Sequence, residues 1–219
     1  STPIELITQQ SRFETIVDLA LKQDRVAVDL ESNGFYHYTE KICLLQLAFH
    51  NQAYLIDTLL LKNFKPLATL FTNNRIEKIF HSADYDIRSL DRDWGIRIHN
   101  LFDTSIASAF IGADKRGLAS VLAEYLNLNI TKDKKLQRAD WSQRPLSDVL
   151  IKYAAEDVLY LDDLRETLVT QLSRLGRAKW VVEECKRLSE IKYNLPDTQW
   201  SFLSVKGSRS LDGRGLAIL

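Results

Sequence analysis

Four carboxylates lie inside short apolar segments of this chain, and their burial limits the folds that the chain can adopt. Asp29 and Glu31 lie in VAVDLES, Asp86 in FHSADYDIRSL, and Asp157 in YAAEDVLYL. An ionised carboxylate in an apolar environment is strongly unfavourable unless a cation or dense hydrogen bonding compensates it. Convergence of the four acids would therefore call for divalent metal ions, and two such ions about 4 Å apart are the usual means of cutting phosphodiester bonds.

The composition is that of a globular protein with one large domain, or one domain and a short appendage, in 219 residues. Lys plus Arg and Asp plus Glu both total 29, which excludes a strongly basic coat for non-specific nucleic-acid binding. Cys43 and Cys185 lack the spacing of a zinc site or a disulfide framework, and they indicate a reducing, cytoplasmic location. No apolar run reaches the roughly 18 residues that span a bilayer, so no membrane partner is predicted.

The order of the apolar runs predicts an α/β fold. Residues 25–32, 41–49 and 53–59 are predicted to form three successive strands, which favours an antiparallel meander. Further strands are expected at 78–82 and 96–104. Helices are expected at 11–22 with Ser11 as a cap, 65–71, 84–95, 104–112, 118–128, from Pro145 to about Leu175 with a break near Tyr153 to Asp157, and after Gly176. This order favours a mixed sheet flanked by helices.

Two of the acidic motifs place their side chains on one side of an element. Asp29 and Glu31 are two apart on a strand, so they leave the same face and repel unless a cation lies between them. Tyr153 and Asp157 are four apart on a helix, where a Tyr hydroxyl beside a metal-bound acid could orient or deprotonate water. Taken alone, each motif also fits a structural interpretation: a half-exposed acidic strand face, or a core Tyr beside a solvated Asp.

Asp84, two residues before Asp86, is an alternative candidate for the acid of this segment. A helix that begins near Asp84 can use that residue as its N-cap, which leaves Asp86 facing the sheet with Ile87. His81, at the end of the preceding strand, is expected to be hydrogen-bonded structure and not a metal ligand. Asp103 is a second candidate capping acid, with Thr104 and Ser105 as competitors for that role.

A basic segment lies between residues 115 and 144. It holds seven basic residues against three acidic ones, which by itself describes only a solvated face. Next to these charges are an aromatic group that can stack on bases and an arginine that can bind phosphate, a combination that suggests a single-stranded nucleic acid partner. The candidate substrate-binding residues are Trp141, Arg144, Lys135 and Arg138.

Taken together, the segments resemble a known family in order and spacing. VAVDLES, KICLLQLA, KIFHSADYDIRSL, FDTSIASAFIG, ADWSQRPL and YAAEDVLYLDDL are similar to the ribonuclease D family of DEDD 3′–5′ exonucleases, in its tyrosine subgroup. The resemblance covers about residues 24–190 and implies a ribonuclease H-like mixed sheet, with three antiparallel strands, then parallel strands, and helices on both sides. It implies a catalytic domain at 1–190 and, at 191–219, a linker or the start of a truncated C-terminal HRDC-like region.

The resemblance also implies which residues carry the chemistry. Asp29 and Glu31 match the first exonuclease motif, Asp86 the second, and Tyr153 with Asp157 the third. The implied cofactors are two divalent ions, Mg²⁺ or Mn²⁺. Asp29, Glu31 and Asp157 would hold one near the attacking water, and Asp29 with Asp86 would hold the other near the leaving 3′-oxygen. Tyr153 would position the water.

The leading hypothesis from the resemblance is a 3′–5′ exoribonuclease that trims the 3′ ends of RNA such as tRNA precursors. It would act on a single-stranded 3′ end, prefer RNA over DNA and release nucleoside 5′-monophosphates. A Werner-type or proofreading DNA 3′–5′ exonuclease shares every metal ligand and stays an alternative. An inactive exonuclease-like domain that only binds RNA is a third, although all four carboxylates and the Tyr are present. The oligomeric state is left open.

Overall fold

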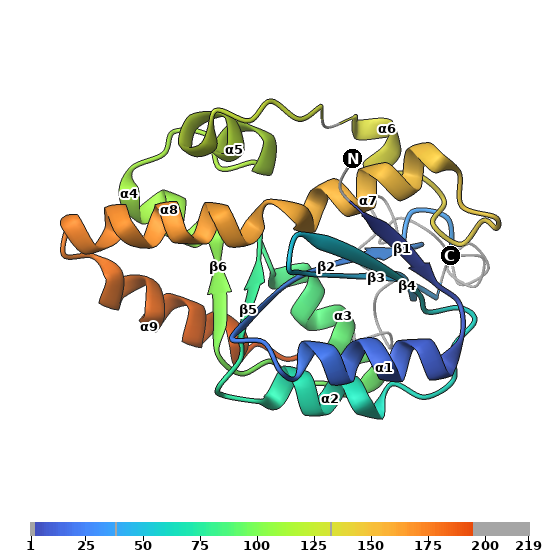
Figure 1. Ribbon diagram of the computed structural model, residues 1–219. Helices are drawn as coiled ribbons and strands as arrows, with labels where there is room; N and C mark the ends of the chain where they lie inside the picture. The colour runs from blue at the N-terminus through green and yellow to red at the C-terminus, as the bar shows by residue number, and fades with distance from the viewer. Residues whose placement is uncertain (1–2, 38, 132, 195–219) are drawn as a thin grey trace, which may run out of the picture.

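The computed structural model describes residues 3–37, 39–131 and 133–194, and in these the strands form a six-stranded mixed sheet. In Figure 1, helices α1 and α2 lie on one face of the sheet, and α7 and α8 lie on the other. The strands are β1 (Ile4–Ile7), β2 (Arg25–Ser32), β3 (Ile42–Phe49), β4 (Gln52–Asp57), β5 (Glu77–Phe80) and β6 (Leu101–Asp103). The helices are α1 (Gln10–Ala20), α2 (Lys65–Thr72), α3 (Asp84–Trp94), α4 (Thr104–Ile111), α5 (Leu118–Leu126), α6 (Lys134–Gln137), α7 (Asp148–Leu159), α8 (Leu161–Arg174) and α9 (Ala178–Ser189).

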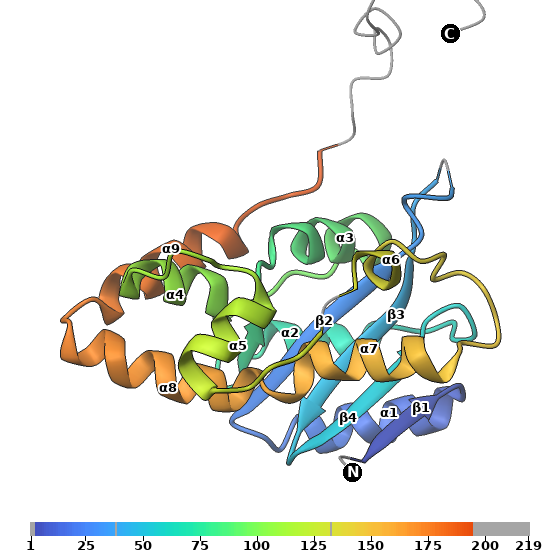
Figure 2. The same cartoon turned by 90° about the horizontal axis from the view of Figure 1, so that it is seen from above.

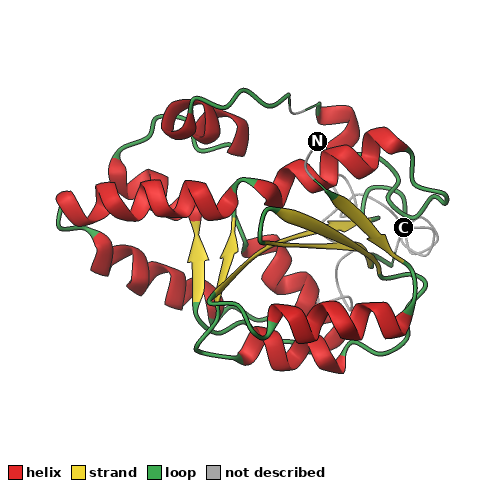
Figure 3. Ribbon diagram, viewed as in Figure 1, coloured by secondary structure: helices red, strands yellow, loops and turns green. Residues whose placement is uncertain are grey.

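The sheet order is β1-β4-β3-β2-β5-β6 (Figure 3). Strands β2, β3 and β4 pair antiparallel, while β5 and β6 continue parallel to β2. This confirms the predicted order of three antiparallel strands followed by parallel ones. The sequence pattern missed β1, an edge strand that pairs parallel to β4. Its four residues are too few to show a clear alternation of apolar and polar side chains. In addition, its apolar residues Ile4 and Leu6 remain partly exposed at the sheet edge.

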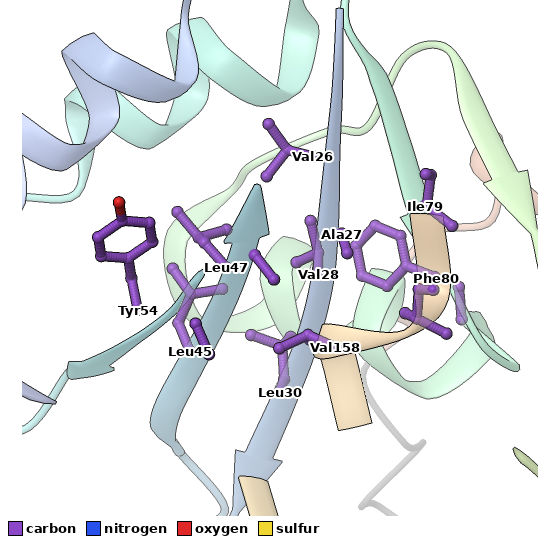
Figure 4. Packing of buried hydrophobic residues seen from close by; sticks show 14 of the residues in the cluster. Val26, Ala27, Val28, Leu30, Leu45, Leu47, Tyr54, Ile79, Phe80 and Val158 are labelled. Atoms are coloured by element: carbon purple, nitrogen blue, oxygen red, sulfur yellow. The ribbon is translucent and has the colours of Figure 1, made fainter. Parts of the chain in front are cut away.

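Strand β3 is central and is covered on both faces, which explains its unbroken apolar sequence. All eight of its residues are buried. Val28 lies opposite Leu47, and Leu30 lies opposite Leu45, in the antiparallel register with β2. These side chains form part of the core in Figure 4. The core therefore fixes the register of β2, which carries Asp29 and Glu31 on its other face.

The structure corrects three details of the predicted elements. The break expected near Tyr153 to Asp157 is wrong: α7 is continuous, and the chain leaves helical geometry at Tyr160, before α8. Helix α7 packs on β2, β3 and β4, whereas α8 packs on β2 and β5, so the two helices cover different parts of the sheet (Figure 2). Only residues 101–103 of the predicted strand 96–104 form a strand, and α1 is capped at Gln9, with Ser11 inside the helix.

Trp141 and Arg144 lie in the segment that leads into α7, and both side chains make contacts within the protein. The Trp141 side chain is 1% exposed. Arg144 donates to both carboxylate oxygens of Asp57, with 2.8 Å between Nη2 and Oδ1, and to the carbonyl oxygens of Trp141 and Cys43. These contacts leave Trp141 no exposed ring face for a base and engage Arg144 with Asp57, and the assignment of the two residues to substrate binding stays a prediction. Their contacts join the start of β3, the end of β4 and the segment before α7.

The part of the chain that the structure describes has no helix long and apolar enough to cross a bilayer. The predicted linker or HRDC-like region at 191–219 lies, from residue 195 onward, outside the described residues.

Replacing Arg144 with Met should lower the free energy of unfolding by about 3–5 kcal/mol, because it leaves the Asp57 carboxylate without its cation. The Asp57 side chain is only 2% exposed, so water cannot replace the lost partner. Urea denaturation followed by circular dichroism measures the change. Arg187→Met, which removes an exposed pair with Glu184, is the control and should leave the midpoint unchanged. Unchanged stability of Arg144→Met with reduced RNA binding would contradict the structural role.

Candidate active site

Three of the four predicted acids converge where α7 passes over β2. Asp29 and Glu31 project from the same face of β2, and Asp157 projects toward them from α7. One carboxylate oxygen from each lies within 4.8 Å of the others. Glu31 is 9% exposed and Asp157 is 8% exposed, so water screens the repulsion among the three only in part. Three carboxylates at this spacing favour the binding of a compensating cation.

Asp86 lies in the first turn of α3, and it lines the same open cavity, of about 660 Å³, as the three clustered acids. Its carboxyl group is buried, and the pKa of Asp86 is raised well above its ordinary value. Burial is the main cause, the charge of Asp29 is the second, and backbone hydrogen bonds from Asp86 itself and from Leu30 oppose both. Asp86 is therefore electrostatically coupled to Asp29 although it lies outside the three-acid cluster.

The donor set fits divalent metal ions. Carboxylate oxygens are hard ligands that suit Mg²⁺ and Mn²⁺, and three of them from two different elements meet at a spacing that one ion can bridge. A cation at this place would remove the repulsion that raises the pKa of Asp86. Because a protonated acid is a poor ligand, metal binding there would release a proton, and metal affinity would rise with pH.

Tyr153 lines the cavity one helical turn before Asp157. Burial raises the pKa of the Tyr153 phenol, and the charges of Glu31 and Asp29 raise it further. The hydroxyl therefore keeps its proton at neutral pH. It can hold a water molecule by hydrogen bonding, but it is unsuited to removing a proton from that water. Of the two roles that the sequence left open, orientation is the one that fits the metal-free environment.

The chain matches a protein family over most of its length. Residues 4–173 match the family model described as a 3′-5′ exonuclease. The chain belongs to this family. It is 34% identical over 194 residues to the exosome complex exonuclease RRP6 of Saccharomyces cerevisiae, which covers 88% of this chain and 26% of RRP6. It is 30% identical over 210 residues to ribonuclease D of Haemophilus influenzae, which covers 94% of this chain and 52% of that protein. The resemblance to ribonuclease D is confirmed, and the chain spans about half or less of these relatives.

Solved structures of related proteins share the fold of this exonuclease domain. The catalytic core of RRP6 from Trypanosoma brucei has a TM-score of 0.87 at 29% identity, over 97% of this chain and 60% of that chain. Brucella melitensis NrnC with bound Mg²⁺ has a TM-score of 0.71 at 26% identity, over 96% of both chains. NrnC bound to pGG has a TM-score of 0.73 at 27% identity, over 97% of this chain and 98% of that chain. The predicted ribonuclease H-like fold is confirmed.

The N-cap of helix α3 in the exonuclease domain is Ala83, without a side-chain capping bond, so the expectation that Asp84 fills this role is wrong, whereas Asp103 caps α4 as the sequence allowed. Asp84 is the first residue inside α3, where its exposed carboxylate pairs with Arg88 at 3.1 Å. The Asp103 carboxylate accepts hydrogen bonds from the backbone amides of Ser82 and Ala83, at 3.1 and 2.7 Å. It also accepts from the backbone amides of Ser105 and Ile106, so one buried acid caps α4 and holds the two residues just before α3.

His81 supports the wall of the cavity. Its Nδ1 lies 2.8 Å from Thr104 Oγ1, and its Nε2 donates to the carbonyl oxygen of Arg116 at 2.8 Å. Both ring nitrogens therefore have protein partners, as the sequence predicted for a structural histidine. The contact with Arg116 attaches the loop before α5 to the end of β5.

Sequence reasoning missed two aromatic side chains at the cavity, Phe35 and Tyr85. Phe35 is 71% exposed, an unusual state for a large apolar side chain. The Arg138 guanidinium lies over its ring, 5.8 Å from the centroid. The Tyr85 hydroxyl lies 2.5 Å from Ser32 Oγ. The signal for Phe35 was its place in the short polar loop SNGFY directly after Asp29 and Glu31.

Replacing Asp86 with Asn should stabilise the metal-free domain at neutral pH. Folding raises the pKa of Asp86, so above the ordinary carboxyl pKa of about 4 the folded state binds more protons than the unfolded state. The free energy of unfolding of the wild type therefore falls as pH rises from about 4 through the folded pKa. Asn does not titrate, so the variant avoids this loss. Urea denaturation in EDTA at about pH 5 and about pH 8 measures it.

The matched control is Asp84→Asn, two residues earlier, where the carboxylate is exposed and paired with Arg88. This variant should follow the wild type at both pH values. If the free energy of unfolding depends on pH equally in Asp86→Asn and in the wild type, the pKa of Asp86 is not raised by folding.

Proposed function

We propose that this domain is a metal-dependent 3′–5′ exoribonuclease that trims RNA 3′ ends, those of tRNA precursors included, and releases nucleoside 5′-monophosphates. The observation that carries the proposal is the meeting of Asp29, Glu31 and Asp157 oxygens within 4.8 Å of one another, in a cavity that Asp86 and Tyr153 also line. The similarity to ribonuclease D and to RRP6 supports RNA as the substrate. A cytoplasmic location stays a prediction.

The proposed cofactors are two divalent ions, Mg²⁺ or Mn²⁺. Asp29, Glu31 and Asp157 would hold one ion, and Asp86 together with Asp29 would hold the other. When bound, such ions make water a nucleophile at neutral pH and stabilise negative charge on the leaving oxygen. The protein's own contribution is to hold these acids at a fixed spacing and to keep the Tyr153 hydroxyl protonated, so that it orients the attacking water.

The exposed pair of Phe35 and Arg138 is the proposed entry for the substrate strand. Phe35 offers a face on which a base can stack, and Arg138 beside it can contact phosphate. Lys135 in α6 is exposed, and it adds positive charge three residues before Arg138. These features suit a single-stranded 3′ end, because a base inside a duplex cannot reach an aromatic face. Lys135 and Arg138 thus stay candidates for substrate binding.

Side-by-side digestion of matched 3′-labelled RNA and DNA, together with the dinucleotide pGG, tests the function. With Mn²⁺ or Mg²⁺, the wild type should release 5′-monophosphates one at a time and degrade RNA faster than DNA, and EDTA should stop the reaction. Asp29→Asn, folded but inactive, controls for contaminating nuclease. Faster digestion of DNA would favour the DNA exonuclease, and cleavage of pGG alone would indicate a dinucleotide-specific enzyme. Metal-dependent RNA binding without hydrolysis would favour the binding scaffold.

Replacing Tyr153 with Phe should lower kcat about 100-fold and leave the KM for RNA nearly unchanged, because the ring keeps its packing while the water loses its hydrogen bond. The centroid of the Tyr153 ring lies 6.1 Å from that of the Trp141 ring, and Phe preserves this contact. Tyr85→Phe is the matched control, since Tyr85 also lines the cavity but its hydroxyl contacts Ser32. Steady-state kinetics at saturating metal measures both variants. Equal losses in the two would argue against a specific role for Tyr153.

A further inference from the structure

Gln46 is a buried amide in the middle of β3, and the contacts of the fold do not explain it. Its side chain is 0% exposed. Neither its amide nitrogen nor its amide oxygen has a hydrogen-bond partner among the described residues. A buried amide without partners is costly, and an apolar side chain of similar size, such as Leu, would pack in its place without that cost. We therefore expect the hydrogen-bond partner of this amide to be a group of the active site.

The register of the sheet indicates which active-site residue is the partner of Gln46. Gln46 lies directly opposite Asp29 in the antiparallel pairing of β2 with β3. Side chains of directly opposed residues leave the same face, with their Cβ atoms about 4.5–5.5 Å apart. Gln46 therefore projects on the face that carries Asp29 and that α7 covers. Its amide, which extends beyond Cβ by two more carbons, is within reach of the Asp29 carboxylate.

The other acids beside Gln46 in the sheet are diagonal to it and not directly opposite, and on β2 the diagonal acid is Glu31. On the opposite side, its directly paired residue is Leu55 of β4. The nearest diagonal acid on β4 is Asp57, and Arg144 already occupies both of its oxygens. Asp29 is thus the acid that the strand pairing brings closest to the amide.

We propose that Gln46 is a positioning residue for Asp29. Its amide nitrogen donates through one water to the Asp29 carboxylate oxygen that would not bind metal, and so fixes the orientation of the carboxylate. The inference rests on the proposed function, since Asp29 needs this orientation only as a metal ligand. Hydrogen bonds of this kind to ligating carboxylates tune metal affinity, and their loss weakens it about 10- to 100-fold.

Calorimetric titration of the wild type and of Gln46→Leu with Mn²⁺ tests the inference. Gln46→Leu should bind Mn²⁺ at least about ten-fold more weakly, while its melting temperature in EDTA is equal to or above that of the wild type. In the RNA digestion assay the half-saturating Mn²⁺ concentration should rise by the same factor, and the KM for RNA at saturating metal should stay unchanged. A merely structural amide would show the opposite: a lower melting temperature and an unaltered Mn²⁺ affinity.

Leu47→Met is the matched control, because Leu47 is the next residue of β3 and is equally buried, but lies on the other face, opposite Val28. It should bind Mn²⁺ like the wild type. If Gln46→Leu does not fold, Gln46→Asn carries the test, since it keeps the amide but shortens its reach, and it should also weaken binding. If the folded Gln46 variant binds Mn²⁺ as tightly as the wild type, the positioning role of Gln46 is wrong, but the proposed function is unaffected. Failure of the wild type itself to bind Mn²⁺ overturns the proposed function as well.

Discussion

Repulsion among carboxylates that are largely buried beside an open cavity is the constraint on which the rest of this structure depends. Asp29, Glu31 and Asp157 present oxygens within 4.8 Å of one another, and Asp86 borders the same cavity. Burial, and after it the charge of Asp29, raises the pKa of Asp86, so the site disfavours the charged form of this acid. Such a site lowers the stability of the metal-free fold, and the surrounding structure has to hold the acids in place.

The elements that hold the acids are linked to one another by polar contacts. Tyr85 of α3 contacts Ser32 Oγ at the end of β2, and Ser32 donates to Glu40 at 2.7 Å. Glu40 pairs with Arg92 of α3, and Arg92 also donates to Asp93 at 2.7 Å. This chain of contacts joins the strand of Asp29 and Glu31 to the helix of Asp86. Asp103, at the end of β6, adds a second connection by accepting hydrogen bonds from the amides of Ser82 and Ala83 just before α3. The spacing of the acids is thus fixed by the scaffold before any ion binds.

Much of the fold could be predicted from the sequence because the periodicity of each segment is local. The alternation in VAVDLES set Asp29 and Glu31 on one face, and the four-residue spacing of Tyr153 and Asp157 set them on one side of a helix. Gly95 also ended α3 as expected, since its φ of 63° suits glycine. Lys78 shows the limit of such reasoning. It is fully buried in β5 with its pKa lowered to about 8 by desolvation, and its ammonium donates to the carbonyls of Asn73 and Ile76 just after α2.

The sequence by itself determined which residues carry the chemistry and which way they leave their own strand or helix, because these depend only on residue type and local periodicity. Tertiary structure alone decided which of them meet. The crossing of α7 over β2 brings Asp157 to Asp29 from 128 positions away. The same packing places Trp141 in the core and pairs Arg144 with Asp57. It also sets Gln46 opposite Asp29. Such contacts join distant segments, and they follow from the burial of whole faces, which no local pattern records.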